Sequence, residues 1–194
     1  MHKHNRGFTI VELLIVIVVI AILASITLVS YSGIRERAHN VVILSAVDSW
    51  VELLSASYVL NGTVAINFAP DHGGGICLGD PADYPAISQL AKNECYPDYF
   101  ADQEIQDKLS SVGNASMKTY PFDIGNGNYT RGVQYTFEGD GHAYVHYDLV
   151  GTGQKCALSG AASIGDTINT KSTDCKIDMT EKLGGHPLDF NWAN

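Results

Sequence analysis

Four cysteines are the residues of this chain with the most definite chemistry available to them. They are Cys77, Cys95, Cys156 and Cys175, and their spacing shows no C-x-x-C pair and no Cys/His pattern of a zinc site. An even number of cysteines in a glycine-rich region beside a membrane segment is typical of disulfides in an oxidising compartment. Proximity along the chain favours Cys77 with Cys95 and Cys156 with Cys175, each disulfide contributing about 3 kcal/mol. Four thiols allow three pairings, and the alternative to any disulfide is four buried free thiols.

Two histidines are the other candidates for chemistry, because His142 and His146 are four residues apart. On a helix that spacing would suggest a shared metal ion, but the surrounding residues alternate as in a strand, where the two positions lie about 13 Å apart. Glu138 would face His142 across the predicted hairpin, so we expect a surface charge pair. The sequence has no G-x-S-x-G, H-E-x-x-H or EF-hand pattern. We therefore expect no enzyme, no metal site and no cofactor.

Glu12 is the one acidic side chain in the most apolar part of the chain, which extends from Phe8 to Val29. As a helix this segment would be about 33 Å long, enough to cross a bilayer core of about 30 Å. A carboxylate inside a bilayer costs about 2.5–3.5 kcal/mol at mid-helix and less near an interface. Glu12 lies near one end of the segment and can therefore stay close to the lipid headgroups. The simplest interpretation is a glutamate that complements the positive end of a helix.

The residues before the apolar segment do not form an ordinary secretory signal. Lys3 and Arg6 are basic, but the apolar run exceeds the about 7–15 residues of a signal peptide, and no A-x-A-like site follows it. The small residue at the boundary between the basic residues and the apolar run is Gly7, which precedes the run. Cleavage after Gly7 would leave the apolar helix on the mature chain.

The stretch GFTIVELLIV, Gly7–Val16, resembles the class III signal of type IV prepilins and their pseudopilin relatives. The resemblance implies cleavage after Gly7 by a prepilin peptidase on the cytoplasmic face and methylation of the new amino terminus at Phe8. It also implies that Glu12 serves assembly. In a filament core the carboxylate would need a cation, and the ammonium at Phe8 of a neighbouring subunit is the available one. A slipped register would leave both charges unpaired.

The chain divides into a leader, a helix in two parts and a head. We expect a leader peptide at 1–7, a transmembrane and assembly helix at 8–30, an amphipathic continuation at 31–60 and an extracytoplasmic globular head at 61–194. In the continuation, apolar residues recur at helical spacing and should pack on the head, with Trp50 in the core. Asn61 and Gly62 should end the helix.

The head is predicted to be a small antiparallel β-sheet, which gives a pilin-like α+β fold. Its clearest signal is the alternation in 133–137 and 143–149. A three-residue loop, Gly139 to Gly141 with Gly141 left-handed, pairs Phe137 with Ala143 and Tyr135 with Val145 and aligns the apolar side chains on one face. That face should cover the second half of the helix.

The rest of the head gives weaker signals. We expect short helices at 85–94 and 98–112, the second capped by Asp98 and stopped by Gly113. Strands are expected near 154–158 and, at most, at 63–68. The C-terminal region should be irregular and tied by a disulfide.

Charge narrows the choice of partners. The formal net charge is −9, and it becomes −11 when Lys3 and Arg6 leave with the leader, so broad binding to nucleic acid is not expected. The basic residues on the two sides of the apolar segment balance, since Arg35 and Arg37 follow it. The orientation with the head outside therefore rests on the peptidase signal and the cysteines.

The resemblance implies a structural subunit of a type IV pilus-like filament, used in adhesion or twitching motility. Its partners would be prepilin peptidase, other pilin subunits, the pilus assembly machinery and, before assembly, membrane lipid. It would cross the cytoplasmic membrane once with its head outside and then enter an extracellular filament. The alternatives are a pseudopilin of a type II secretion system, a competence pilin for DNA uptake, and a membrane-tethered enzyme or binding protein that never polymerises.

Overall fold

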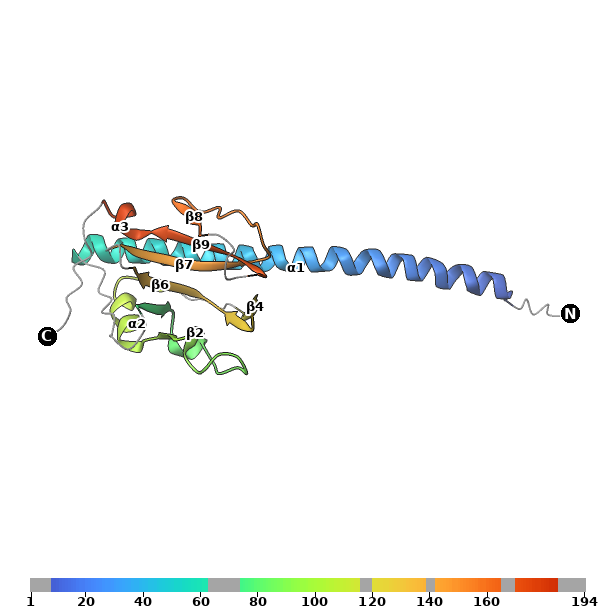
Figure 1. Ribbon diagram of the computed structural model, residues 1–194, viewed down its shortest axis with the longest axis horizontal. Helices are drawn as coiled ribbons and strands as arrows, with labels where there is room; N and C mark the ends of the chain where they lie inside the picture. The colour runs from blue at the N-terminus through green and yellow to red at the C-terminus, as the bar shows by residue number, and fades with distance from the viewer. Residues whose placement is uncertain (1–7, 63–73, 116–119, 139–141, 165–169, 185–194) are drawn as a thin grey trace, which may run out of the picture. The chain divides into compact units, whose positions relative to one another are not determined.

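The structure is a computed structural model that describes residues 8–62, 74–115, 120–138, 142–164 and 170–184. The chain forms two compact units, Met1–Ala38 and His39–Asn194, and helix α1, Ile10–Asn61, contributes to both. The second unit is called the head unit below. It contains a β-sheet, the C-terminal part of α1 and three short helices (Figure 1).

Helix α1 begins and ends close to where the sequence predicts. It passes Gly33 without interruption and ends at Asn61, after which Gly62 has a φ of +72°. The N–H of Gly62 donates to the carbonyl of Tyr58 at 2.8 Å. A glycine in the left-handed conformation satisfies the free carbonyls at a helix C-terminus without a Cβ clash, so the predicted stop is confirmed.

Seven strands form one sheet in the order β2-β3-β1-β6-β7-β9-β8. All neighbours pair antiparallel except β1 and β3, and β4 and β5 form a separate two-stranded sheet. The strands are β1 Gly75–Leu78, β2 Glu94–Tyr96, β3 Tyr99–Ala101, β4 Phe122–Gly125, β5 Asn128–Thr130, β6 Val133–Phe137, β7 Ala143–Val150, β8 Ala161–Ser163 and β9 Ser172–Asp178. The short helices are η1 Pro81–Asp83, α2 Gln103–Ser110 and α3 Met179–Lys182. The predicted pilin-like α+β fold is confirmed.

The central hairpin has the predicted register. Tyr135 pairs with Val145 and Phe137 with Ala143, while the loop from Gly139 to Gly141 lies outside the described residues. The apolar face of the hairpin shares one core with α1, whose Val47, Trp50 and Leu54 are fully buried. The prediction that Trp50 is a core residue is therefore confirmed.

The helix expected at 85–94 is wrong. The 3-10 turn η1 ends just before this segment, and there is no helix within it. The guanidinium of Arg131 accounts for the difference: its nitrogens donate to the carbonyls of Pro85, Ala91 and Glu94 at 2.6, 3.2 and 2.8 Å. Carbonyls that point to one buried cation are not available for a helix ladder.

The expected helix at 98–112 begins later than predicted. Residues Tyr99–Ala101 form β3, and Asp98 has a left-handed φ of +69°. Helix α2 starts at Gln103, capped by the carboxylate of Asp102. The tertiary pairing of β3 with β1 and β2 therefore overrides the local helix signal.

The C-terminal region is more regular than predicted. Residues 154–158 are not a strand, and β8 follows at Ala161–Ser163 instead. Strand β9 is paired along its whole length with β7, which makes it an inner strand of the sheet. The strand considered at 63–68 lies outside the described residues.

Candidate functional site

The first part of α1 is a continuous apolar surface. Every side chain from Ile10 to Ile26 is exposed, with Ile10 at 84% and Ile17 at 63%. A contiguous exposed apolar surface of this kind marks contact with a membrane or with other proteins. It is the most distinctive surface of the unit Met1–Ala38.

A second part of α1, Gly33–Asn61, is also long and apolar enough to cross a membrane by composition. It differs from the first part because 44% of its most apolar 18-residue stretch is buried, and Val47 and Trp50 are fully buried. The core of the head unit therefore explains its buried apolar side chains, whereas others, such as Val41 and Val59, are exposed. Ile10–Ile26 has no such explanation, and this stretch is the candidate for contact with lipid or with partner helices.

Thr9 and Glu12 form a reciprocal cap at the start of α1. The N–H of Thr9 and its hydroxyl both donate to Oε2 of Glu12, at 2.7 and 2.8 Å. In return the N–H of Glu12 donates to Oγ1 of Thr9 at 3.2 Å. This is a capping box, in which two main-chain N–H groups at a helix start are satisfied by side chains.

The cap has a direct consequence for the role of Glu12. Its carboxylate is held toward the N-terminal end of the helix, beside Phe8, which is 83% exposed. The helix-end interpretation of Glu12 is thus realised within one chain. Pairing with a neighbour's ammonium stays a prediction, as do cleavage at Gly7 and methylation at Phe8; Gly7 lies outside the described residues.

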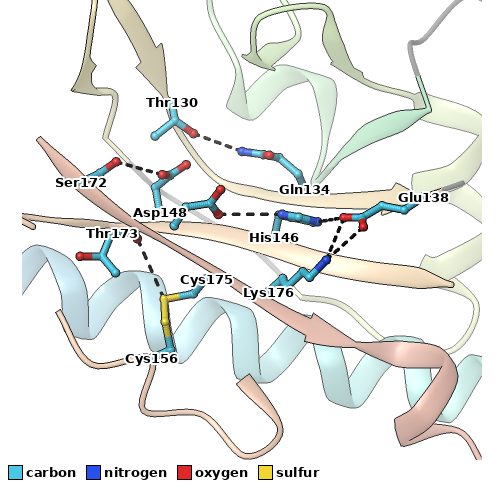
Figure 2. Close-up of polar contacts among 11 residues, drawn as sticks. Thr130, Gln134, Glu138, His146, Asp148, Cys156, Ser172, Thr173, Cys175 and Lys176 are labelled. Atoms are coloured by element: carbon cyan, nitrogen blue, oxygen red, sulfur yellow. Dashed lines mark hydrogen bonds and ion pairs between the residues drawn. A yellow bond between two sulfur atoms is a disulfide. The ribbon is translucent and has the colours of Figure 1, made fainter. Parts of the chain in front are cut away.

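The cysteines form two disulfides, Cys77–Cys95 and Cys156–Cys175, each with a Cα–Cα distance of 5.8 Å. These are the pairings that proximity along the chain favours. The first joins β1 to β2, and the second joins β9 to the segment before β8 (Figure 2). Cys77, Cys95 and Cys175 are buried, so the disulfides tie outlying segments to the sheet rather than present reactive sulfur.

The expected charge pair between Glu138 and His142 is wrong. Their main chains pair, with the N–H of Glu138 donating to the carbonyl of His142 at 3.0 Å. The carboxylate of Glu138 instead lies 3.2 Å from Nε2 of His146 and 3.0 Å from Nζ of Lys176, as Figure 2 shows. His142 contacts Asp178, with Nδ1 and Oδ2 2.6 Å apart. The difference arises because β9 pairs with β7 and places Lys176 opposite His146. The sequence did not predict this strand.

Comparison with known proteins concerns the same N-terminal residues. A model of the prokaryotic N-terminal methylation motif matches residues 2–28. By this segment, the comparisons support a type IV pilin family for the chain. The matched residues include the capped Glu12 and the whole exposed apolar stretch Ile10–Ile26.

One curated relative extends the match. The type IV wide pilus major component PilA4 of Thermus thermophilus is 33% identical over 67 residues, which cover 34% of this chain and 51% of the relative. The chain thus spans about half the length of the relative it matches. No solved structure matches the chain significantly.

Proposed function

We propose that this chain is a structural subunit of a type IV pilus-like filament. Prepilin peptidase removes residues 1–7, Phe8 becomes the methylated amino terminus, and residues 8–30 hold the subunit in the cytoplasmic membrane with the head outside. The assembly machinery then transfers the helix into an extracellular filament of pilin subunits. The observation that carries this proposal is the exposed apolar helix Ile10–Ile26, headed by a capped glutamate, within the methylation motif.

The exposed apolar surface accounts for both stages of this pathway. Each large apolar side chain left in water forgoes about 1.5–3 kcal/mol of burial free energy, so the helix needs lipid or other helices around it. Between lipid and a helix bundle, however, there is little hydrophobic difference, because lipid tails are as apolar as leucine. Extraction into a filament therefore depends on the machinery and on specific contacts between helices.

Glu12 supplies such a specific contact. The hydrogen bonds from Thr9 reduce the cost of keeping a carboxylate in an apolar helix, but they leave its charge uncompensated. An ammonium at Phe8 of a neighbouring subunit compensates that charge in only one axial register. The pair thereby favours correct stacking more than it adds stability.

The first experiment identifies the mature amino terminus by mass spectrometry of the protein from its native cells. The expected chain begins at Phe8 and carries one added methyl group. A chain that retains residues 1–7 contradicts the proposal, because the leader would then block the ammonium at Phe8.

A second experiment tests the role of Glu12 with a matched control. Glu12→Gln should leave processed subunits in the membrane and strongly reduce their incorporation into sheared surface filaments. Glu36→Gln, another exposed glutamate of α1, should assemble normally. Equal incorporation of both variants would contradict the charge-pairing step. The filament role would then be tested separately, by whether the chain is found in sheared filaments.

The name of the relative, a pilus major component, supports a pilus over a type II secretion pseudopilin or a competence pilin. Adhesion and twitching motility are the uses that such a filament would serve. The proposed role is structural rather than catalytic. Peptide identification in sheared filaments tests it, and detection of the chain only as a single membrane-bound species would contradict it.

A further inference from the structure

We propose that the head unit binds a small organic cation, with an ammonium or guanidinium group, in a pocket on the polar face of its sheet. The cavity has a volume of about 390 Å³, within the range of small-molecule sites. Its lining comes from β2, β3, β6, β7 and β9. This inference stands on the head unit alone and does not depend on the proposed filament role.

Strand alternation separates the pocket from the core. Tyr135, Val145 and Ile177 lie in the core shared with α1. The neighbouring residues of the same strands point to the other face, and Gln134, Thr136 and His146 among them line the pocket. Figure 2 shows Gln134, Glu138 and His146 with Asp148 and Lys176 over these strands.

Two tyrosines form an aromatic wall of the pocket. The rings of Tyr96 and Tyr99 have centroids 5.5 Å apart. Tyr99 lies directly against strand β1 at Gly75, where an added Cβ would come within 2.6 Å of the ring. Glycine at this position therefore permits the ring position. A tyrosine face attracts cations through its quadrupole, with the best contacts within about 6 Å of the centroid.

Carboxylates supply the charge. Asp148 and Asp174 line the pocket together with Glu138, which already contacts Lys176 and His146. Among the described lining residues themselves there is no lysine or arginine. Burial raises the pKa of Tyr96 and of Tyr99, and the negative charge of Asp174 raises both further. The carboxylates and the aromatic wall thus act on the same space, which favours a positive ligand.

The same sheet face already holds an ammonium group in this way. Nζ of Lys176 lies 3.9 Å from the ring centroid of Tyr144 and 3.0 Å from Glu138. The pocket offers a second set of the same groups, with Tyr99 as the ring and Asp174 as the carboxylate. A cation of similar size is the ligand that matches this set.

The lining residue Thr136 carries a buried hydroxyl. Thr136 is only 6% exposed, and its Oγ1 has no hydrogen-bond partner among the described residues. A buried hydroxyl without a partner is costly. The described residues contain no group of three or more His, Cys, Asp or Glu arranged for a metal ion, which favours an organic cation over calcium.

The test uses the full chain in a non-ionic detergent and isothermal titration calorimetry. The probes are n-butylguanidinium and n-butylammonium, each compared with its neutral analogue, n-butylurea and n-butanol. We expect saturable binding of at least one cation, at least tenfold tighter than its neutral analogue. Glucose and calcium chloride are titrated as two further probes. The proposal is overturned if a cation and its neutral analogue bind with equal affinity, or if only glucose or only calcium chloride binds.

Three variants complete the test. Asp174→Asn removes charge, and Gly75→Ala displaces the ring of Tyr99 while keeping every carboxylate. Each should weaken cation binding at least tenfold. Glu104→Gln, a carboxylate on α2 paired with Lys108, should bind as the wild type does. Near-UV circular dichroism verifies that each variant is folded, and unchanged affinity in the two folded pocket variants overturns the proposal.

Discussion

Replacement of Arg131 by lysine tests how the head unit holds the segment from Pro85 to Glu94. Arg131 is 2% exposed, and its guanidinium donates to three main-chain carbonyls in this segment. It also lies 5.5 Å from the ring centroid of Tyr84. Lysine keeps the charge but concentrates its donors on one nitrogen, so it reaches one of the three carbonyls.

The expected loss follows from the two hydrogen bonds that lysine cannot make. A buried acceptor left without its donor costs about 1–3 kcal/mol, so two such carbonyls cost about 2–6 kcal/mol. Pro85 and Ala91 are exposed residues, and water can reach part of their main chain. We therefore expect the free energy of unfolding to fall by about 2–4 kcal/mol.

Two measurements on the full chain in detergent check this expectation. Urea unfolding is followed by tryptophan fluorescence, to which the fully buried Trp50 contributes. Limited trypsin digestion reports on the segment itself, because Lys92 is exposed within it. Arg131→Lys should lower the unfolding midpoint and accelerate cleavage after Lys92, whereas the control Arg37→Lys, on an exposed site, should do neither.

The reasoning is refuted if Arg131→Lys unfolds within about 0.5 kcal/mol of the wild type, the range of ordinary surface substitutions. A lower midpoint with unchanged cleavage after Lys92 would contradict the local part of the argument. In that case Arg131 would stabilise the head without holding this segment.

Three further predictions concern the cap, a surface ion pair and a disulfide. Thr9→Val should destabilise the first turn of α1 by about 0.5–2 kcal/mol, seen as faster hydrogen exchange there, while Thr9→Ser should preserve protection. Lys171 donates to Asp123 and holds the pKa of that carboxyl below its usual range, so the pair stabilises the fold above the ordinary aspartate pKa of about 3.9 and loses its effect as the pH falls through the lower folded value. Asp123→Asn should therefore unfold more easily than the wild type at neutral pH, and the difference should vanish in acid; a constant difference contradicts this linkage. Replacing Cys156 and Cys175 by serine should lower stability by about 3 kcal/mol, measured by urea unfolding without reductant, because their separation of 19 residues sets the loop that the disulfide closes.

Features that depend on covalent neighbours could be predicted from the sequence. The apolar segment from Phe8 and the cap residues Thr9 and Glu12 are adjacent in the chain, and the glycine after Asn61 acts within one helical turn. The β6–β7 register followed from alternation, because a shift by one residue would turn the apolar face away from the core.

Features that depend on distant segments could not be predicted in this way. The segment 85–94 has helix-compatible residues, but Arg131, far along the chain, binds its carbonyls. Glu138 contacts Lys176 because β9 pairs with β7, and the weak alternation of β9 gave no sign of that pairing.

The sequence by itself therefore determined the apolar helix, its two ends and the central hairpin. Only the tertiary structure decided the strand order, the partners of the buried charges and the pocket whose lining five strands contribute. The physical reason is the separation along the chain over which each interaction acts. Caps, turns and alternation act between residues that the chain already holds close together, whereas strand neighbours are chosen by the burial of the whole core, which no short stretch of sequence specifies.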